Sequence, residues 1–224
     1  QPLAFVMPSY RCWEAPFYGV GLKMYDALAG SAGLGATEFL GVQRTLQCLP
    51  TARPDGLKGG VKYWDGQFDD ARLALALART AARHGALLVN YCAARSLVHD
   101  AGKVSGVLCE DTETGKAYKI RARCVVNATG VWVDALRQQD SEATDRPVRP
   151  IVAPSQGVHV VVDREFLPSD HALMVPKTAD GRVLFAVPWL GKVILGTTDS
   201  QRNDIDREPE TFAEDMQFIL GDSA

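Results

Sequence analysis

The sequence predicts a mixed α/β fold of the α+β class, in which an α/β part precedes a part built on an antiparallel sheet. Three observations lead to this prediction. An alanine- and leucine-rich segment at 71–83 is typical of a helix, and an apolar strand-like segment follows it. Three short strands separated by turn residues then predict a meander. Four further strand-like segments lie between residues 157 and 197.

The first 60 residues combine loops with one helix. Residues 8–16 are rich in proline and aromatic residues and are predicted to form a loop. Apolar residues recur at helical spacing from Phe17 to Leu28, so a helix is predicted there. The glycines of 30–35 end this helix. Residues 36–60 are predicted to be irregular, with short helical stretches.

The next segment predicts a helix followed by strands. Asp69 or Asp70 can cap the helix at 71–83, and Gly85 ends it. A strand is predicted at 86–91. Asp- and Gly-containing turns then separate the three strands of the meander, which are predicted at about 93–99, 103–110 and 117–123.

The second half begins with a short buried strand predicted at 124–127, which leads into Ala128-Thr129-Gly130 and a helix at about 132–138. The polar stretch 139–147 is predicted to be a linker. The antiparallel part then has predicted strands at about 157–163, 172–177, 182–189 and 192–197, and a final helix at about 209–220.

Composition excludes several classes of protein. Of 224 residues, 46% are hydrophobic and 23% are charged, which is ordinary for a globular protein. The net charge of -3 gives no basic field for nucleic acid. Apolar runs are far shorter than the roughly 20 residues of a membrane span, although peripheral membrane contact stays open. Five scattered cysteines without a C-x-x-C motif predict free thiols and no metal site.

Both ends of the chain suggest an interior piece of a longer protein. The chain starts with Gln1-Pro2-Leu3 and not with Met, and no charged segment followed by a long apolar segment marks a signal peptide. It stops at Ala224, directly after a helix-like run. We therefore expect a fold that is truncated at both ends.

The turn at 128–130 is the first candidate site. A strand that ends in small residues before a helix can bring backbone N–H groups close to a phosphate. Thr129 adds a hydroxyl, and Gly130 permits a close approach. The pattern alone favours a tight turn that binds nothing. The Gly30–Gly35 segment follows a helix and not a strand, so a flexible loop is predicted there.

His159 is the second candidate. Strand alternation places it on the face of Gly157 and Val161, opposite Val158, Val160 and Val162. An imidazole in an otherwise apolar strand needs a hydrogen-bond partner or a function, and the residue pattern leaves both open. The other three histidines lie near turns or helix ends. Arginines and lysines of the antiparallel part flank turns, and none is singled out.

Several motifs, in order and spacing, resemble the FAD-dependent glycerol-3-phosphate dehydrogenases of the D-amino-acid-oxidase-like flavoprotein superfamily. The likeness covers nearly the whole chain, including 3–8 and 22–26. The main motifs are G-G-V-K-Y-W-D-G-Q-F-D-D-A-R-L at 59–73, V-N-A-T-G-V-W-V-D at 126–134, S-Q-G-V-H at 155–159, D-G-R-V-L-F at 180–185 with P-W at 188–189, and G-T-T-D at 196–199.

The resemblance implies an FAD-binding α/β domain and a substrate domain on an antiparallel sheet. It implies oxidation of sn-glycerol 3-phosphate to dihydroxyacetone phosphate, with hydride transfer to FAD and electrons passed to quinone. The longer protein is then expected to be cytoplasmic and peripheral at the inner membrane. The implied ranges are 1–60 for a helical cap and substrate-domain segment, 61–140 for part of the FAD domain, and 147–224 for the substrate domain.

The resemblance also assigns roles to residues. His159 matches an active-site histidine that takes the proton of the substrate's C2 hydroxyl. The turn Ala128-Thr129-Gly130 matches a flavin-contacting loop. The backbone near Ala93, just past the predicted strand 86–91, matches the contact to the adenine end of FAD.

Two alternatives stay open. A glycerol-3-phosphate oxidase gives its electrons to oxygen, and a non-catalytic module uses the sheet only to bind a ligand. The family's strand–G-x-G-x-x-G–helix motif does not occur in this sequence, and its phosphate-gripping residues are expected outside it. We therefore expect the 224-residue chain to bind FAD weakly or not at all and to be inactive alone.

Overall fold

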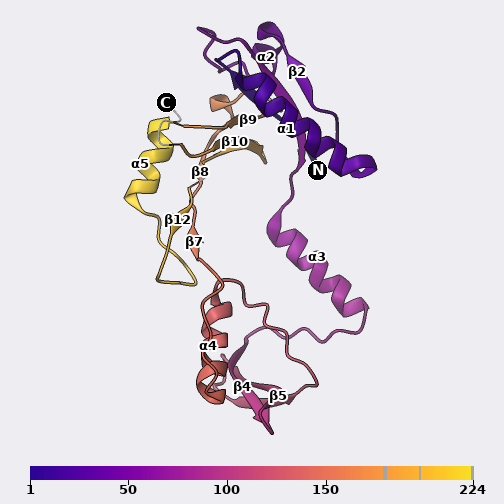
Figure 1. Ribbon diagram of the computed structural model, residues 1–224, viewed down its shortest axis with the longest axis vertical. Coiled ribbons are helices and arrows are strands. Elements are labelled where there is room, and N and C mark those ends of the chain that lie inside the picture. The colour runs from indigo at the N-terminus through magenta and orange to yellow at the C-terminus, as the bar shows by residue number, and fades with distance from the viewer. Residues whose placement is uncertain (179–180, 197, 223–224) are drawn as a thin grey trace. The chain divides into compact units, whose positions relative to one another are not determined.

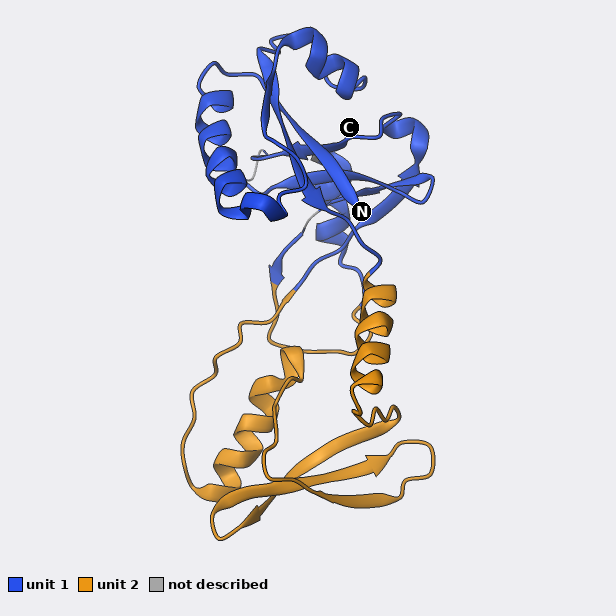
Figure 2. Ribbon diagram, turned by 90° about the vertical axis from the view of Figure 1, so that its right-hand side faces the viewer, with its two compact units in different colours: residues 1–69, 156–200, 210–224 blue, residues 70–155, 201–209 orange. Residues whose placement is uncertain are grey.

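The computed structural model describes residues 1–178, 181–196 and 198–222. It contains two compact units (Figure 2). Unit 1 comprises 1–69, 156–200 and 210–224, and unit 2 comprises 70–155 and 201–209. Unit 2 is therefore inserted into unit 1 along the chain.

Unit 1 is built on a seven-stranded sheet (Figure 1). Its strands, in spatial order, are β2 (Glu38–Leu40), β3 (Gly59–Gly66), β1 (Pro2–Ser9), β9 (Ala172–Val175), β10 (Leu184–Trp189), β11 (Lys192–Leu195) and β8 (Val160–Asp163). Strands β1 and β9 pair in parallel, and the other neighbours pair antiparallel. The sheet thus joins the first residues of the chain to segments more than 160 residues later.

The sheet has one core face and one open face, as period-two alternation requires. The core face carries Val6 of β1, Ala186 of β10, and Val193 and Leu195 of β11, which cluster with Ile219. The strand residues beside them in sequence, such as Phe5, Phe185 and Ile194, line a cavity on the other face. This alternation is what places functional side chains on the open face.

The helices of unit 1 are α1 (Glu14–Ala29), α2 (Val42–Cys48) and α5 (Ala213–Asp222), with short 3₁₀ turns η1 (Gly30–Ala32) and η3 (Arg164–Phe166). The carboxylate of Glu14 accepts the backbone N–H groups of Tyr10 and Arg11 at 2.8 and 3.0 Å, which fixes the entry into α1. Asp26 accepts the N–H of Thr37 at 2.7 Å and ties the following loop to the helix.

Unit 2 contains a three-stranded meander and two helices. Its strands are β4 (Cys92–Asp100), β5 (Lys103–Asp111) and β6 (Ala117–Arg121), and its helices are α3 (Asp70–Arg83) and α4 (Val133–Thr144), with the 3₁₀ turn η2 (Gly130–Trp132) directly before α4. Gly102 and Gly115 have φ of 75° and 72°, as the two tight turns require. Two-residue strands β7 (Ser155–Gln156) and β12 (Ser200–Gln201) pair separately.

The predicted fold class, the helices at 17–28 and 71–83, the meander, the four later strands and the final helix are confirmed. The strands predicted at 86–91 and 124–127 are wrong. In the described part of the chain, no strand pairs with either segment, and Leu87 and Val126 are 89% and 82% exposed. An apolar run forms a strand only where a neighbouring strand takes up its backbone N–H and C=O groups.

Three further segments differ from expectation. The predicted loop at 8–16 includes the end of β1 and the start of α1. The segment 36–60 contains the short helix α2, as expected, but also strand β2 and the start of β3, and α4 continues to Thr144 through the expected linker. The units also differ from the ranges 1–60, 61–140 and 147–224, because β1 to β3 share one sheet with β8 to β11.

Candidate active site

His159 lies in unit 1, immediately before β8, and its side chain is exposed on the open face of the sheet. Val158, Val160 and Val162 pack against the core on the opposite face. Val161, which shares the face of His159, is 64% exposed. The structure therefore confirms the two faces that alternation predicted for this segment.

The backbone that carries His159 is held against the segment after β11. The N–H of Val158 donates to Oγ1 of the buried Thr198 at 2.8 Å. A Cβ at Gly157 would lie 2.4 Å from the carbonyl oxygen of Thr198, so only glycine fits this approach. Two neighbours of His159 thus fix its main chain. Asp180 and Thr197, which belong to the motifs around this site, lie outside the described residues.

A cavity of about 240 Å³ adjoins His159 on the open face. Its wall is aromatic: the rings of Phe5 and Tyr63 stack with centroids 5.3 Å apart, and Phe185 meets Phe5 edge-on at 5.9 Å. The full lining consists of Phe5, Tyr63, Asp65, His159, Phe185, Val187, Ile194 and Gly196. An apolar cavity with a few polar groups is the usual form of a small-molecule site.

Tyr63 is a neutral member of this wall. Burial, followed by the charge of Asp65 and by Tyr25, raises the pKa of Tyr63 to about 12. Its hydroxyl donates to the sulfur of Met174 at 3.2 Å. Tyr63 therefore does not act as a base here, and His159 is the other titratable side chain with a ring in the described lining of this cavity.

The turn at 128–130 lies in unit 2 and is held by Asn127. The Oδ1 of Asn127 accepts the hydroxyl of Thr129 at 2.8 Å, and its Nδ2 donates to the carbonyl of Val133 at 3.0 Å. Ala128, Thr129 and Gly130 are exposed, Gly130 has a φ of 59°, and a Cβ added at Gly130 would meet no other atom within 4 Å. The turn leads into η2 and α4, so N–H groups of a helix start follow an accessible, glycine-containing backbone.

Asp134, which the sequence analysis left without a role, anchors this region. Its Oδ2 accepts the N–H groups of Val152 and Ile151 at 2.9 and 2.8 Å, and its Oδ1 accepts Arg137 at 2.6 Å. The hydrogen bond from Val152, together with those from Arg137 and Ile151, lowers the pKa of Asp134. The position of Asp134 at the end of the V-N-A-T-G-V-W-V-D motif is the feature of the sequence that could have indicated this role.

A protein-family model described as FAD dependent oxidoreductase matches residues 17–223. The chain belongs to this FAD dependent oxidoreductase (DAO) family. It is 43% identical to the mitochondrial glycerol-3-phosphate dehydrogenase of Rattus norvegicus over 99% of the chain and 30% of that protein. The human enzyme is 41% identical over the same shares. The chain thus spans about a third of the length of the curated relatives that it matches.

Solved structures agree with this assignment. The glycerol-3-phosphate dehydrogenase of Bacillus halodurans complexed with FAD is 32% identical, with a TM-score of 0.78 over all of this chain and 39% of that one. The L-alpha-glycerophosphate oxidase of Mycoplasma pneumoniae with FAD bound shares the fold at a TM-score of 0.63 and 18% identity, over 91% of this chain and 51% of that one. The resemblance to FAD-dependent glycerol-3-phosphate dehydrogenases is therefore confirmed.

FAD is the cofactor of the family, and the accessible turn at 128–130 before η2 and α4 fits the approach of such a group. Ala93 lies in the predicted strand, as the second residue of β4 and opposite Glu110, but residues 86–91 before it do not form the predicted strand. Ala93 and the turn belong to unit 2, whereas His159 belongs to unit 1.

Other ionisable residues of this family member have structural partners. His99, expected near a turn and solvated, is only 20% exposed at its side chain and lies 2.7 Å from the carboxylate of Asp140 on α4. The guanidinium carbon of Arg182 lies 3.4 Å from the ring centroid of Phe218. Within the described ranges, no group of three His, Cys, Asp or Glu side chains has the arrangement of a metal site.

Proposed function

We propose that this chain carries part of the active site of an FAD-dependent glycerol-3-phosphate dehydrogenase. The observation that supports it most is His159 on the open sheet face, next to an aromatic cavity. Similarity over 99% of the chain to mitochondrial glycerol-3-phosphate dehydrogenases points to the same substrate class. The proposed reaction converts sn-glycerol 3-phosphate to dihydroxyacetone phosphate.

In this proposal, His159 is the general base. Oxidation of the secondary alcohol removes two electrons in the form of one hydride from C2, and one proton from the C2 hydroxyl. FAD, when bound, accepts the hydride. His159 takes the proton, because its imidazole is accessible beside the cavity and its main chain is fixed through Val158 and Gly157. The aromatic rings of the wall offer an apolar surface against which the carbon skeleton of the substrate can pack.

For the cofactor, we propose contacts to the backbone of Ala128, Thr129 and Gly130, and to the backbone near Ala93. The exposed turn and the helix start that follows it support the first contact. Because the G-x-G-x-x-G motif does not occur among these 224 residues, we propose that the chain alone holds FAD weakly and is inactive. Stoichiometric flavin absorbance in the purified chain would contradict this.

The electron acceptor is proposed to be a quinone at a membrane surface, with the longer protein cytoplasmic and peripheral at the inner membrane. Among the described residues, none of the helices has the length and apolar character needed to cross a bilayer. We assign unit 1, which carries His159 and its cavity, to the substrate side, and unit 2, which carries the turn at 128–130, to the cofactor side. In the full-length protein, the rate of reduction of a quinone analogue can be compared with the rate of peroxide release. Faster quinone reduction would support a dehydrogenase, and faster peroxide release would identify an oxidase.

The test is His159→Asn in the full-length flavoenzyme. We expect kcat to fall by about 10²- to 10⁴-fold, since asparagine cannot take the proton. His84→Asn, at the exposed end of α3, is the matched control and should leave kcat unchanged. A near-normal kcat for His159→Asn, with flavin content intact, would return His159 to a structural role.

A further inference from the structure

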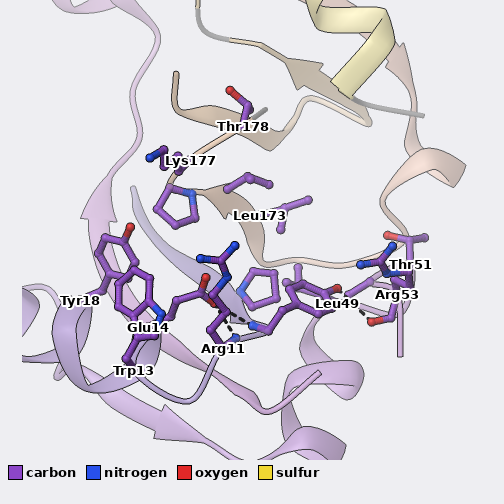
Figure 3. Close-up of a pocket in the computed structure, with 15 residues that line it drawn as sticks. Arg11, Trp13, Glu14, Tyr18, Leu49, Thr51, Arg53, Leu173, Lys177 and Thr178 are labelled. Atoms are coloured by element: carbon purple, nitrogen blue, oxygen red, sulfur yellow. Dashed lines mark hydrogen bonds between the residues drawn. The ribbon is translucent and has the colours of Figure 1, made fainter. Parts of the chain in front are cut away.

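A second cavity in unit 1 lies apart from His159 (Figure 3). Its volume is about 520 Å³, and it shares no described lining residue with the cavity beside His159. It forms where the parallel strands β1 and β9 end, between the start of α1 and the segment 49–53 after α2. Its size is within the range of about 300–1,000 Å³ that is typical of small-molecule sites.

The lining of this cavity is positively charged. The cavity is lined by Arg11, Arg53 and Lys177, which come from three separate segments of the chain. In the view of Figure 3, the side chain of Arg11 points into the space below Lys177. Glu14 is the one carboxylate in the described lining, and its Oε2 already accepts the backbone N–H groups of Tyr10 and Arg11. An anion entering the cavity therefore meets more cationic than anionic charge.

The same cavity has aromatic walls that its own contacts hold in place. Tyr10 donates its hydroxyl to the carbonyl of Arg53 at 2.9 Å, and the guanidinium carbon of Arg53 lies 5.4 Å from the Tyr10 ring centroid. Trp13 and Tyr18 line the cavity from α1 and its start, with ring centroids 6.4 Å apart. The site thus combines fork-shaped cations with flat apolar surfaces.

We propose that this cavity binds a phosphate monoester with a flat apolar body. A phosphate monoester carries a charge of about -1.5 to -2 at pH 7, which suits the excess of cations. Guanidinium groups bind phosphate oxygens in pairs, and the body stacks on Trp13 and Tyr18. The site is separate from the proposed catalytic site, and the proposal does not depend on the activity assigned to His159.

Calorimetric titration of the chain with phenyl phosphate tests the proposal. We expect saturable binding with one site, weaker binding of inorganic phosphate, and no binding of phenol. Arg11→Gln and Lys177→Gln should each weaken binding about tenfold or more, as loss of a charge-assisted hydrogen bond does. Lys192→Gln, on β11, is the control and should bind like the parent. Circular dichroism verifies that each variant is folded.

Two more variants separate the alternatives. Glu14→Gln keeps an oxygen for the backbone N–H groups but removes the negative charge, so it should tighten binding of phenyl phosphate. His159→Asn should leave it unchanged, because His159 does not line this cavity. The proposal would be overturned if the unsubstituted chain did not bind phenyl phosphate, or if the substitutions at Arg11, Lys177 and Glu14 did not change its affinity. Equal affinity for inorganic phosphate and phenyl phosphate would overturn the proposed apolar body.

Discussion

The buried hydroxyl of Thr198 accepts a hydrogen bond from the backbone N–H of Val158 at 2.8 Å, one residue before His159. The bond ties the candidate base to the segment that follows β11. Because Gly157 also approaches the Thr198 carbonyl closely, a single buried threonine positions the main chain on the N-terminal side of His159.

Thr198→Val should destabilise unit 1 by about 1–3 kcal/mol, because the N–H of Val158 loses its acceptor while the side-chain volume is kept. Urea unfolding of the chain measures this. Thr198→Ser keeps the hydroxyl and should retain most of the stability. If the two variants lose the same amount, the hydrogen bond is not what holds this segment.

Tyr63→Phe should reduce the loss of stability at high pH. The folded-state pKa of Tyr63, about 12, is above the ordinary value of 10.0, so its contribution is present below pH 10 and is lost as pH rises toward 12. The full effect is up to about 2–3 kcal/mol. Urea unfolding between pH 9 and 11.5 measures it, and Tyr118→Phe on β6 serves as control. Parallel pH curves for parent and Tyr63→Phe would contradict the prediction.

Asp134→Asn should lower the stability of unit 2 at pH 7, and the difference should shrink as the solution is acidified. Hydrogen bonds from Val152, Arg137 and Ile151 lower the pKa of Asp134, so its contribution is present above the ordinary value near 3.8 and is lost as pH falls through the lower folded value. The urea midpoint at pH 7, 3.5 and 2.5 measures this. Asp145→Asn, in a left-handed position that asparagine tolerates, should have little effect.

The local pattern of residues was sufficient to predict the structure of segments whose conformation depends mainly on their own sequence. Alternation in 157–163 placed His159 opposite Val158, Val160 and Val162, and turn residues located the meander. It was insufficient where a partner is distant. Strand β1 pairs in parallel with β9 across more than 160 residues, and no period in 2–9 encodes that partner.

The same limit explains the two wrong strands and the missed anchor. Leu87 and Val126 are apolar, but a strand depends on hydrogen bonds to a neighbour and not on composition. Asp134 on α4 accepts hydrogen bonds from the backbone N–H groups of Ile151 and Val152, which lie 17 and 18 residues farther along the chain. Local pattern does not indicate such distant partners. The cavity with Arg11, Arg53 and Lys177 likewise exists only once three separate loops meet.

The insertion of unit 2 within unit 1 has a consequence for biosynthesis. During synthesis, residues 70–155 of unit 2 leave the ribosome before the residues of β9, β10 and β11 have been synthesised. The meander of unit 2 can close early through local pairing, whereas β1 must wait for Phe5 and Val6 to meet Ala172 and Leu173. During that interval, the edge of β1 that will face β9 is unpaired, so nascent chains are most vulnerable to aggregation there.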